Sequence, residues 1–141
     1  MREVGKVLSL FKSKQKSDEI LLDESGVVGD KFYAKDANRS VLLISYDSYD
    51  LAKRAGINPP DGSLGENILL SFNPYNLPLG TNIKIADVVL EISQNCTLCN
   101  SLSKVDAKLP KLLKDDRGIF AKVVKGGVIK VDDKIFLKGE N

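Results

Sequence analysis

Short apolar runs, each ended by turn-forming residues, are the feature of this sequence that most limits its fold. Residues 40–45, Ser-Val-Leu-Leu-Ile-Ser, are nearly all apolar and predict a buried strand. Similar runs recur along the chain and are separated by glycine, proline, asparagine and aspartate. This pattern is typical of an all-β sandwich or barrel. We predict strands at residues 4–11, 19–22, 40–45, 66–72, 82–86, 88–93, 118–125, 128–131 and 134–137.

One helix is predicted directly after the strand at 40–45. Ser45 or Asp47 can cap its N-terminus, Tyr49 and Ala52 follow at near-helical spacing, and Gly56 stands where a helix commonly ends. Near the other end of the chain, the glycine pair at 126–127 predicts a two-residue hairpin turn. The last three predicted strands would then form a meander.

Length and charge exclude several classes of protein. The 141 residues predict a single domain over residues 1–141. Lysine and arginine number 21 and aspartate and glutamate 19, so the net charge of +2 argues against a nucleic-acid-binding protein. Charged residues interrupt the first apolar run, and no run reaches the roughly 18–20 residues of a membrane span. We expect a cytoplasmic protein without a membrane partner.

The sequence contains no histidine. Histidine is the commonest general base and the commonest metal ligand in proteins. Its absence excludes a Ser-His-Asp triad, a Cys-His dyad and zinc sites of the mixed Cys/His type. The chemistry of this chain must use thiols, carboxylates, amines, hydroxyls or a bound cofactor.

The sequence Cys96-Thr-Leu-Cys99 is the first candidate for such chemistry. A CxxC pair can be a redox dithiol, half of a zinc site, or one functional thiol with a neighbour, and buried cysteines are often plain packing residues. Zinc would need two more soft ligands, which the chain lacks. Polar residues on both sides of the pair favour a loop or the mouth of a site over a core strand.

A glycine-rich segment, Gly29-Asp30-Lys31, is followed by Arg39 eight residues after Lys31. Glycine lets the backbone approach a ligand closely, and main-chain amides can then surround an anion. Lys31 and Arg39 would add positive charge. An ordinary glycine turn between two strands is the competing interpretation.

Two further segments place polar residues at the start of a predicted strand. Glu66-Asn67 offers a charge and an amide, and an amide can bind a ring edge through its donor and its acceptor together. Arg117 precedes the strand that carries Lys122, and the forked guanidinium of arginine suits phosphate. A strand cap and a hairpin with a solvated lysine would explain the same residues without a ligand.

Taken in chain order, these segments resemble the MOSC family, the domain named for the C-terminus of molybdenum-cofactor sulfurases. The matching stretches are residues 26–31 with Arg39, and residues 59–69, 77–93, 96–99 and 117–135. The resemblance implies a β-barrel with a few short helices that binds molybdenum cofactor or handles its sulfur. One departure is Phe32-Tyr33, because many small bacterial members have histidine shortly after the Gly-Asp pair.

The resemblance also implies roles for individual residues. Cys99 matches the family's functional thiol, as a sulfur carrier or as the ligand to molybdenum, and Cys96 would be a neighbour or resolving thiol. Nearby cations would lower the pKa of that thiol and neutralise the cofactor phosphate. The residues expected to bind the cofactor are Gly29, Asp30, Lys31, Arg39, Glu66, Asn67, Arg117 and Lys122. We expect residues 26–31, 65–67 and 96–99 to converge with Arg117 at one mouth of the barrel.

Three functions remain open from the sequence. The chain can be a sulfur-transfer protein, loaded by a donor such as a cysteine desulfurase, or a reductase of N-hydroxylated compounds. A reductase would need an electron-transfer partner, because no flavin, haem or iron–sulfur motif is present. It can instead be a non-catalytic module that delivers a pterin cofactor. A plain CxxC dithiol redox protein is the third alternative.

Overall fold

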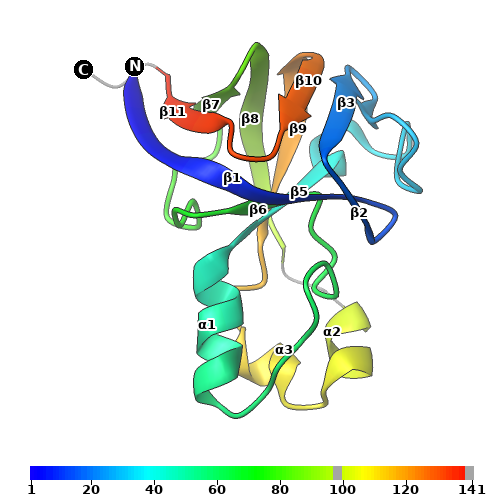
Figure 1. Ribbon diagram of the computed structural model, residues 1–141, viewed down its shortest axis with the longest axis vertical. Coiled ribbons are helices and arrows are strands. Elements are labelled where there is room, and N and C mark those ends of the chain that lie inside the picture. The colour runs from blue at the N-terminus through cyan, green and yellow to red at the C-terminus, as the bar shows by residue number, and fades with distance from the viewer. Residues whose placement is uncertain (97–99, 139–141) are drawn as a thin grey trace.

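Each strand predicted from the sequence has a counterpart in the computed structural model, which describes residues 1–96 and 100–138. The strands are β1 (Arg2–Lys12), β2 (Gln15–Ser17), β3 (Glu19–Asp23), β4 (Gly26–Val27), β5 (Val41–Ser45), β6 (Ile68–Leu70), β7 (Asn82–Ile85), β8 (Val88–Asn95), β9 (Ile119–Lys125), β10 (Gly127–Lys130) and β11 (Lys134–Leu137). The helices are the 3₁₀ turn η1 (Ala37–Arg39), α1 (Tyr46–Arg54), α2 (Asn100–Val105) and α3 (Leu109–Leu112). Figure 1 shows the strands crossing at one end of the molecule and α1, α2 and α3 at the other.

The main sheet closes on itself. Within the described residues, seven strands follow in the order β11, β7, β8, β9, β5, β6 and β1, and β1 pairs with β11 to complete the ring. The pairing of β5 with β6 is parallel and the other pairings of the ring are antiparallel. β2 extends the sheet beside β1, and a smaller sheet has the order β10, β3, β4. The predicted β-barrel is thereby confirmed.

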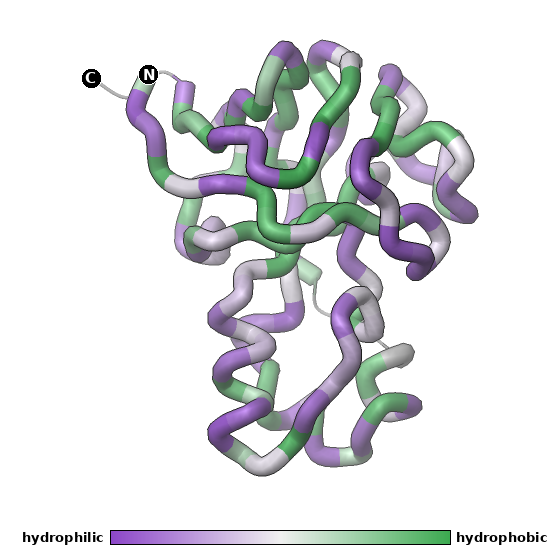
Figure 2. The backbone as a smooth tube through the Cα atoms, in the orientation of Figure 1, coloured by the Kyte–Doolittle hydropathy of each residue, from purple (hydrophilic) through white to green (hydrophobic). Residues whose placement is uncertain are grey.

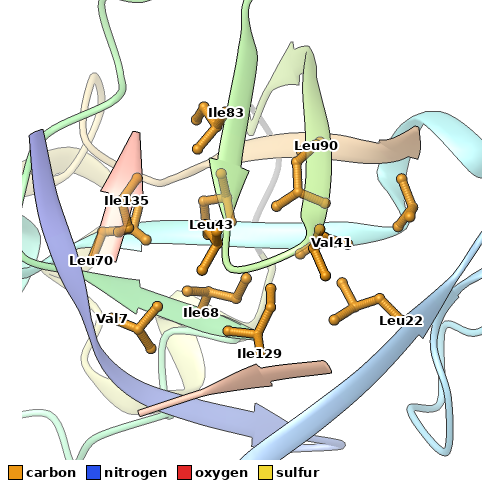
Figure 3. Close-up of a cluster of buried hydrophobic side chains, with 14 of the residues drawn as sticks. Val7, Leu22, Val41, Leu43, Ile68, Leu70, Ile83, Leu90, Ile129 and Ile135 are labelled. Carbon is orange, nitrogen blue, oxygen red and sulfur yellow. The ribbon is translucent and has the colours of Figure 1, made fainter. Parts of the chain in front are cut away.

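The inside of the barrel is filled by aliphatic side chains, which we call the barrel core. It includes Val7, Val41, Leu43, Ile68, Leu70, Ile83, Leu90 and Ile135, together with Leu22 and Ile129 from the smaller sheet. Figure 2 shows hydrophobic residues along the crossing strands and a hydrophilic stretch at the turn between β1 and β2. Figure 3 shows the core side chains converging from opposite walls. The smaller sheet therefore packs onto the same core as the barrel.

A second apolar cluster lies outside the barrel wall, where the helices pack, and we call it the outer cluster. Its members are Leu42, Ile44, Tyr49, Ala52, Ile57, Leu64, Leu69, Cys96, Leu102, Leu109, Leu113 and Phe120. β5 serves both clusters, because Val41 and Leu43 face the barrel core while Leu42 and Ile44 face the outer cluster. Successive side chains of a strand point to opposite faces, so burial on both faces explains the continuous apolar run.

The helix predicted after residue 45 is α1. The Ser45 hydroxyl accepts a hydrogen bond from the backbone N–H of Asp47 at 3.0 Å and caps the helix. The chain leaves the helix at Gly56, whose φ of +80° is easily adopted by glycine. Tyr49 and Ala52 are buried and pack α1 against the outer cluster.

None of the helices in residues 1–96 and 100–138 has the length and apolar character that a membrane crossing requires.

The predicted C-terminal hairpin and meander are wrong. β9 pairs with β5 and β8, whereas β10 pairs with β3 and β11 pairs with β7 and β1. The glycine pair marks the place where the chain passes from the barrel to the smaller sheet. At Gly126 a side chain would collide with the carbonyl oxygen of Leu22 and approach the Cα of Asp23 to 3.0 Å. Glycine is therefore needed for a close crossing of two backbones, and no hairpin forms there.

Candidate functional site

A pocket of about 440 Å³ lies where segments far apart in the sequence meet. Its walls come from the turn between β1 and β2, the loop between β4 and η1, the beginning of β5, residues 64–67, the end of β8 and β9. Pockets that hold small molecules usually measure roughly 300–1,000 Å³. The pocket is therefore large enough for a small ligand with a ring system.

Asp30 holds three of these segments together. One carboxylate oxygen, Oδ1, accepts hydrogen bonds from the backbone N–H of Ser13 at 2.6 Å and from Nδ2 of Asn67 at 3.3 Å. The other, Oδ2, accepts from the backbone N–H of Phe32 at 3.1 Å. Gly29, just before it, has a φ of +87° and is not among the residues that line the pocket. Gly29 and Asp30 thus shape the loop and the neighbouring turn.

Asn67 is tied to the protein through its whole amide. Its Oδ1 accepts from the backbone N–H of Leu42 at 3.0 Å, and its Nδ2 donates to the carbonyl oxygen of Phe11 and to Asp30, both at 3.3 Å. The sequence suggested this amide for binding a ring edge. In the structure its donor and its acceptor are both engaged in joining β1, β5 and the Asp30 loop.

Glu66 is the buried carboxyl of the pocket, with 1% of its surface exposed. Its Oε2 accepts a hydrogen bond from the Tyr49 hydroxyl at 2.6 Å, and that hydroxyl accepts from the backbone N–H of Gly62 at 3.0 Å. Its Oε1 is buried and has no hydrogen-bond partner among the described residues. Burial raises the pKa of Glu66 and also raises the pKa of Tyr49, so the tyrosine keeps its proton and donates it.

Positive charge gathers at the exposed side of the pocket. Among the described lining residues the cations are Lys14, Lys31, Lys35 and Arg39, all of them exposed. The Arg39 guanidinium lies 4.8 Å from the ring centre of Phe120, which forms part of the apolar wall. These lysines and the arginine, which we call the cationic rim, face solvent, whereas Glu66 lies in the protein interior.

Phe32 lines the pocket beside the cationic rim, with 55% of its surface exposed. The Lys31 ammonium group is 5.0 Å from the centre of its ring. The mouth of the pocket therefore carries an exposed aromatic ring at the first residue of the Phe32-Tyr33 pair that the sequence analysis singled out.

The CxxC segment begins at the pocket wall. Cys96 lines the pocket, is 5% exposed and donates its backbone N–H to the carbonyl oxygen of Gly118 at 3.1 Å. It is disulfide-bonded. Cys99, to which the resemblance assigns the functional thiol, lies outside the described residues. Within the part of the chain that the structure describes, no cluster of three or more acidic or cysteine side chains is arranged for a metal ion.

Besides Gly29, two predicted cofactor-binding residues, Arg117 and Lys122, are not among those that line the pocket. Arg117 donates from Nη2 to the carbonyl oxygen of Pro110 at 2.6 Å, which ties the start of β9 to α3. Lys122 lies 3.3 Å from the Glu91 carboxylate, its register partner on β8. The pocket instead brings together Asp30, Lys31, Arg39, Glu66, Asn67 and Cys96.

Sequence reasoning missed the turn between β1 and β2 as part of the site. Ser13 and Lys14 both have positive φ, at 48° and 67°, and the Ser13 hydroxyl accepts from the backbone N–H of Lys31 at 2.8 Å. The alternating lysines at 12, 14 and 16 are the only local signal of a charged tip. Their position above the pocket depends on long-range contacts with the Asp30 loop.

Comparison with protein families and solved structures gives a consistent result. The family model described as MOSC domain matches residues 27–136. YuaD from Bacillus subtilis is similar in structure, with a TM-score of 0.77, 19% identity, and 95% of this chain and 93% of that chain covered. YiiM from Escherichia coli has a TM-score of 0.77 and 18% identity, with 98% of this chain and 71% of that chain covered. At such identities these two structures show the fold alone. A search of curated proteins finds no match.

Proposed function

The chain belongs to the MOSC domain family, which is associated with molybdenum cofactor binding, and we propose that its pocket binds the pterin part of that cofactor. The observation that carries the proposal is one pocket that has a cationic rim, an apolar wall and Cys96. Arginine and lysine bind phosphate through charge-assisted hydrogen bonds. Lys31 and Arg39 would hold the phosphate, and the wall formed by Leu42, Leu64 and Phe120 would hold the ring system.

The residues present fit this cofactor. The lining offers cations for an anion, apolar side chains for a flat ring and an unpartnered carboxylate oxygen on Glu66 for a ring N–H. A thiolate is a soft ligand and suits molybdenum or sulfane sulfur. When bound, the cofactor supplies the metal centre for redox or group-transfer chemistry, while the protein positions it and limits access of water.

Cys99 is the proposed functional thiol, either as a ligand to molybdenum or as a sulfur carrier. As a carrier, its thiolate attacks the terminal sulfur of a donor persulfide, forms a Cys99 persulfide and releases the donor as a thiolate. The donor would be a protein persulfide of the cysteine desulfurase kind. Reduction of any disulfide in the CxxC pair by a cellular dithiol must precede this step, because only a thiolate is nucleophilic.

Metal and pterin analysis of protein made in a cofactor-producing host tests the proposal. We expect molybdenum and an oxidised, fluorescent pterin at close to one equivalent each in the purified, folded protein. Arg39→Ala should lower both, whereas Lys122→Ala, a matched loss of charge outside the pocket, should lower neither. Folded protein without molybdenum or pterin contradicts cofactor binding. If the CxxC pair of such cofactor-free protein is reversibly reduced and oxidised by a dithiol, the remaining alternative is the CxxC dithiol redox protein.

The two cysteines should behave unequally once reduced. Cys99→Ser should abolish persulfide formation and molybdenum retention, because it removes the soft ligand and keeps its size. Cys96→Ser should retain much of both. Alkylation rate against pH, followed by mass spectrometry of each reduced variant, measures the remaining thiol. A faster, lower-pKa thiol at Cys96 would transfer the proposed role to that residue.

A further inference from the structure

The pocket differs chemically between its interior and its mouth. Glu66 is almost fully buried, whereas Lys14, Lys31, Lys35 and Arg39 are exposed, so the acceptor and the cations lie at different depths. A ligand that satisfies both ends must carry a hydrogen-bond donor at one end and an anion at the other. Leu42, Leu64 and Phe120 line the pocket beside them and suit an apolar ring.

The hydrogen bonds around Glu66 leave one atom for a ligand. The Tyr49 hydroxyl accepts the Gly62 N–H, and its own proton goes to Oε2 of Glu66. Oε1 is buried without a hydrogen-bond partner among the described residues, and Glu66 is one of the residues that line the pocket. A buried carboxylate oxygen without a hydrogen bond is costly to the folded protein, so such atoms are rare and often mark the place of a missing partner.

We infer that Oε1 of Glu66 accepts a hydrogen bond from an N–H at the ring end of the ligand, so that the ligand enters ring first and leaves its anionic end at the cationic rim. This inference rests on the proposed function for the identity of the ligand as a pterin. The class it names is a flat nitrogen heterocycle with ring N–H or amino donors and an anionic tail. Glu66 selects the heterocycle and the rim selects the tail.

Two fluorescent probes separate these roles. Pterin-6-carboxylate carries ring and amino N–H donors and an anion, whereas 6-carboxy-1,3-dimethyllumazine keeps the bicyclic ring and the anion but has no ring N–H. The native protein should bind the pterin at least tenfold more tightly than the lumazine. Glu66→Gln should weaken the pterin by about 10- to 100-fold, the range for a lost hydrogen bond to a charged group, and leave the lumazine within twofold.

The rim variants should act on both probes equally. Arg39→Ala and Lys31→Ala should weaken the pterin and the lumazine by the same factor, because both probes carry the carboxylate. Glu91→Gln is the matched control for Glu66→Gln, since it makes the same chemical change at a carboxylate that is paired with Lys122 outside the pocket. Fluorescence titration gives the affinities, and thermal unfolding shows that each variant is folded.

Several outcomes would overturn the inference. The first is that the native protein binds neither probe at millimolar concentration. The second is that Glu66→Gln weakens the binding of both probes equally. The third is that the preference for the pterin survives Glu66→Gln, which would mean that the methyl groups of the lumazine, and not its lack of a ring N–H, weaken its binding. A variant that fails to fold is replaced by Glu66→Asp, which withdraws the acceptor by one methylene and should also lose the preference. Selection of the pterin by a protein that never retains molybdenum would preserve this inference and remove the proposed function. Retention of molybdenum without selection of the pterin would support the proposed function and overturn this inference.

Discussion

The barrel core and the outer cluster share strands β5, β6 and β9, from which they take alternate residues, yet their compositions differ. The barrel core consists of aliphatic side chains only, among the described residues. The outer cluster adds Tyr49, Cys96 and Phe120, and four of its members, Leu42, Leu64, Cys96 and Phe120, also line the pocket. One face of each shared strand therefore stabilises the fold while the other borders the ligand site.

This contrast in composition shows where polar side chains are tolerated in this protein. The barrel is closed by hydrogen bonds around its whole circumference, so a polar side chain inside would lack a partner. The outer cluster is covered by loops and short helices that bring backbone donors, such as the Gly62 N–H that meets Tyr49. A buried carboxyl such as Glu66 is compatible with that region because its neighbours supply hydrogen bonds.

Truncation of neighbouring leucines in β5 gives the largest expected contrast. Leu43→Ala should lower the free energy of unfolding by about 2–5 kcal/mol, because it opens a cavity in the closed barrel core. Leu42→Ala should cost roughly 1–2 kcal/mol, since Leu42 borders the pocket and its removal enlarges a space open to solvent. Urea unfolding measures both. Equal costs would mean that the two clusters behave as one core.

Removal of the Tyr49 hydroxyl should give the next largest effect. Tyr49→Phe leaves Oε2 of Glu66 and the backbone N–H of Gly62 without their partner and should cost about 1–3 kcal/mol. Tyr33→Phe is the control, because its hydroxyl donates to Asp23 near the surface and should cost less. Chemical denaturation compares the two variants. A neutral Tyr49→Phe would show that Glu66 does not depend on this hydrogen bond.

The pH dependence of stability should distinguish Glu66 from a surface carboxyl. Burial raises the folded-state pKa of Glu66 above the unfolded value of about 4.3, so its contribution to stability is greatest at low pH and falls as pH rises through the folded pKa. Glutamine does not titrate, so Glu66→Gln should gain stability relative to the native protein as the pH rises from about 4.3, the unfolded-state pKa of glutamate, through the raised folded-state pKa. Calorimetry across that range measures the difference. A difference independent of pH would contradict the raised pKa.

The ion pair of Lys122 with Glu91 should give the smallest effect. It lies on the outside of the barrel wall, with the two side chains 41% and 31% exposed, and such pairs contribute about 0–1 kcal/mol. Lys122→Ala should therefore change the unfolding free energy by less than about 1 kcal/mol. It should also leave affinity for pterin-6-carboxylate within twofold. A larger loss of affinity would restore Lys122 to the site for which the sequence proposed it.

Helices and strands that depend on neighbouring residues could be predicted from the sequence, whereas strand pairings that depend on residues far apart in the chain could not. The run at residues 40–45 and the Ser45 cap each carry their own signal, so β5 and α1 were found. The glycine at 126 was misread, because its partner Leu22 lies about a hundred residues earlier in the chain. The clustering of site segments came from the family resemblance. The engagement of Asn67 with Phe11 and Leu42 depends on tertiary contacts that no local pattern encodes.

Closure of the barrel by β1 and β11 has a consequence for synthesis on the ribosome. β1 pairs with β11 through contacts such as Arg2 with Leu137, so the first strand made requires the last one. Until then β1 exposes an unpaired edge, and such edges promote association between unfinished chains. Contacts between strands so distant in sequence also slow folding. Final assembly of this domain therefore waits until β11 has left the ribosome, and a chain stalled before β11 would have an open barrel with its aliphatic interior accessible to chaperones.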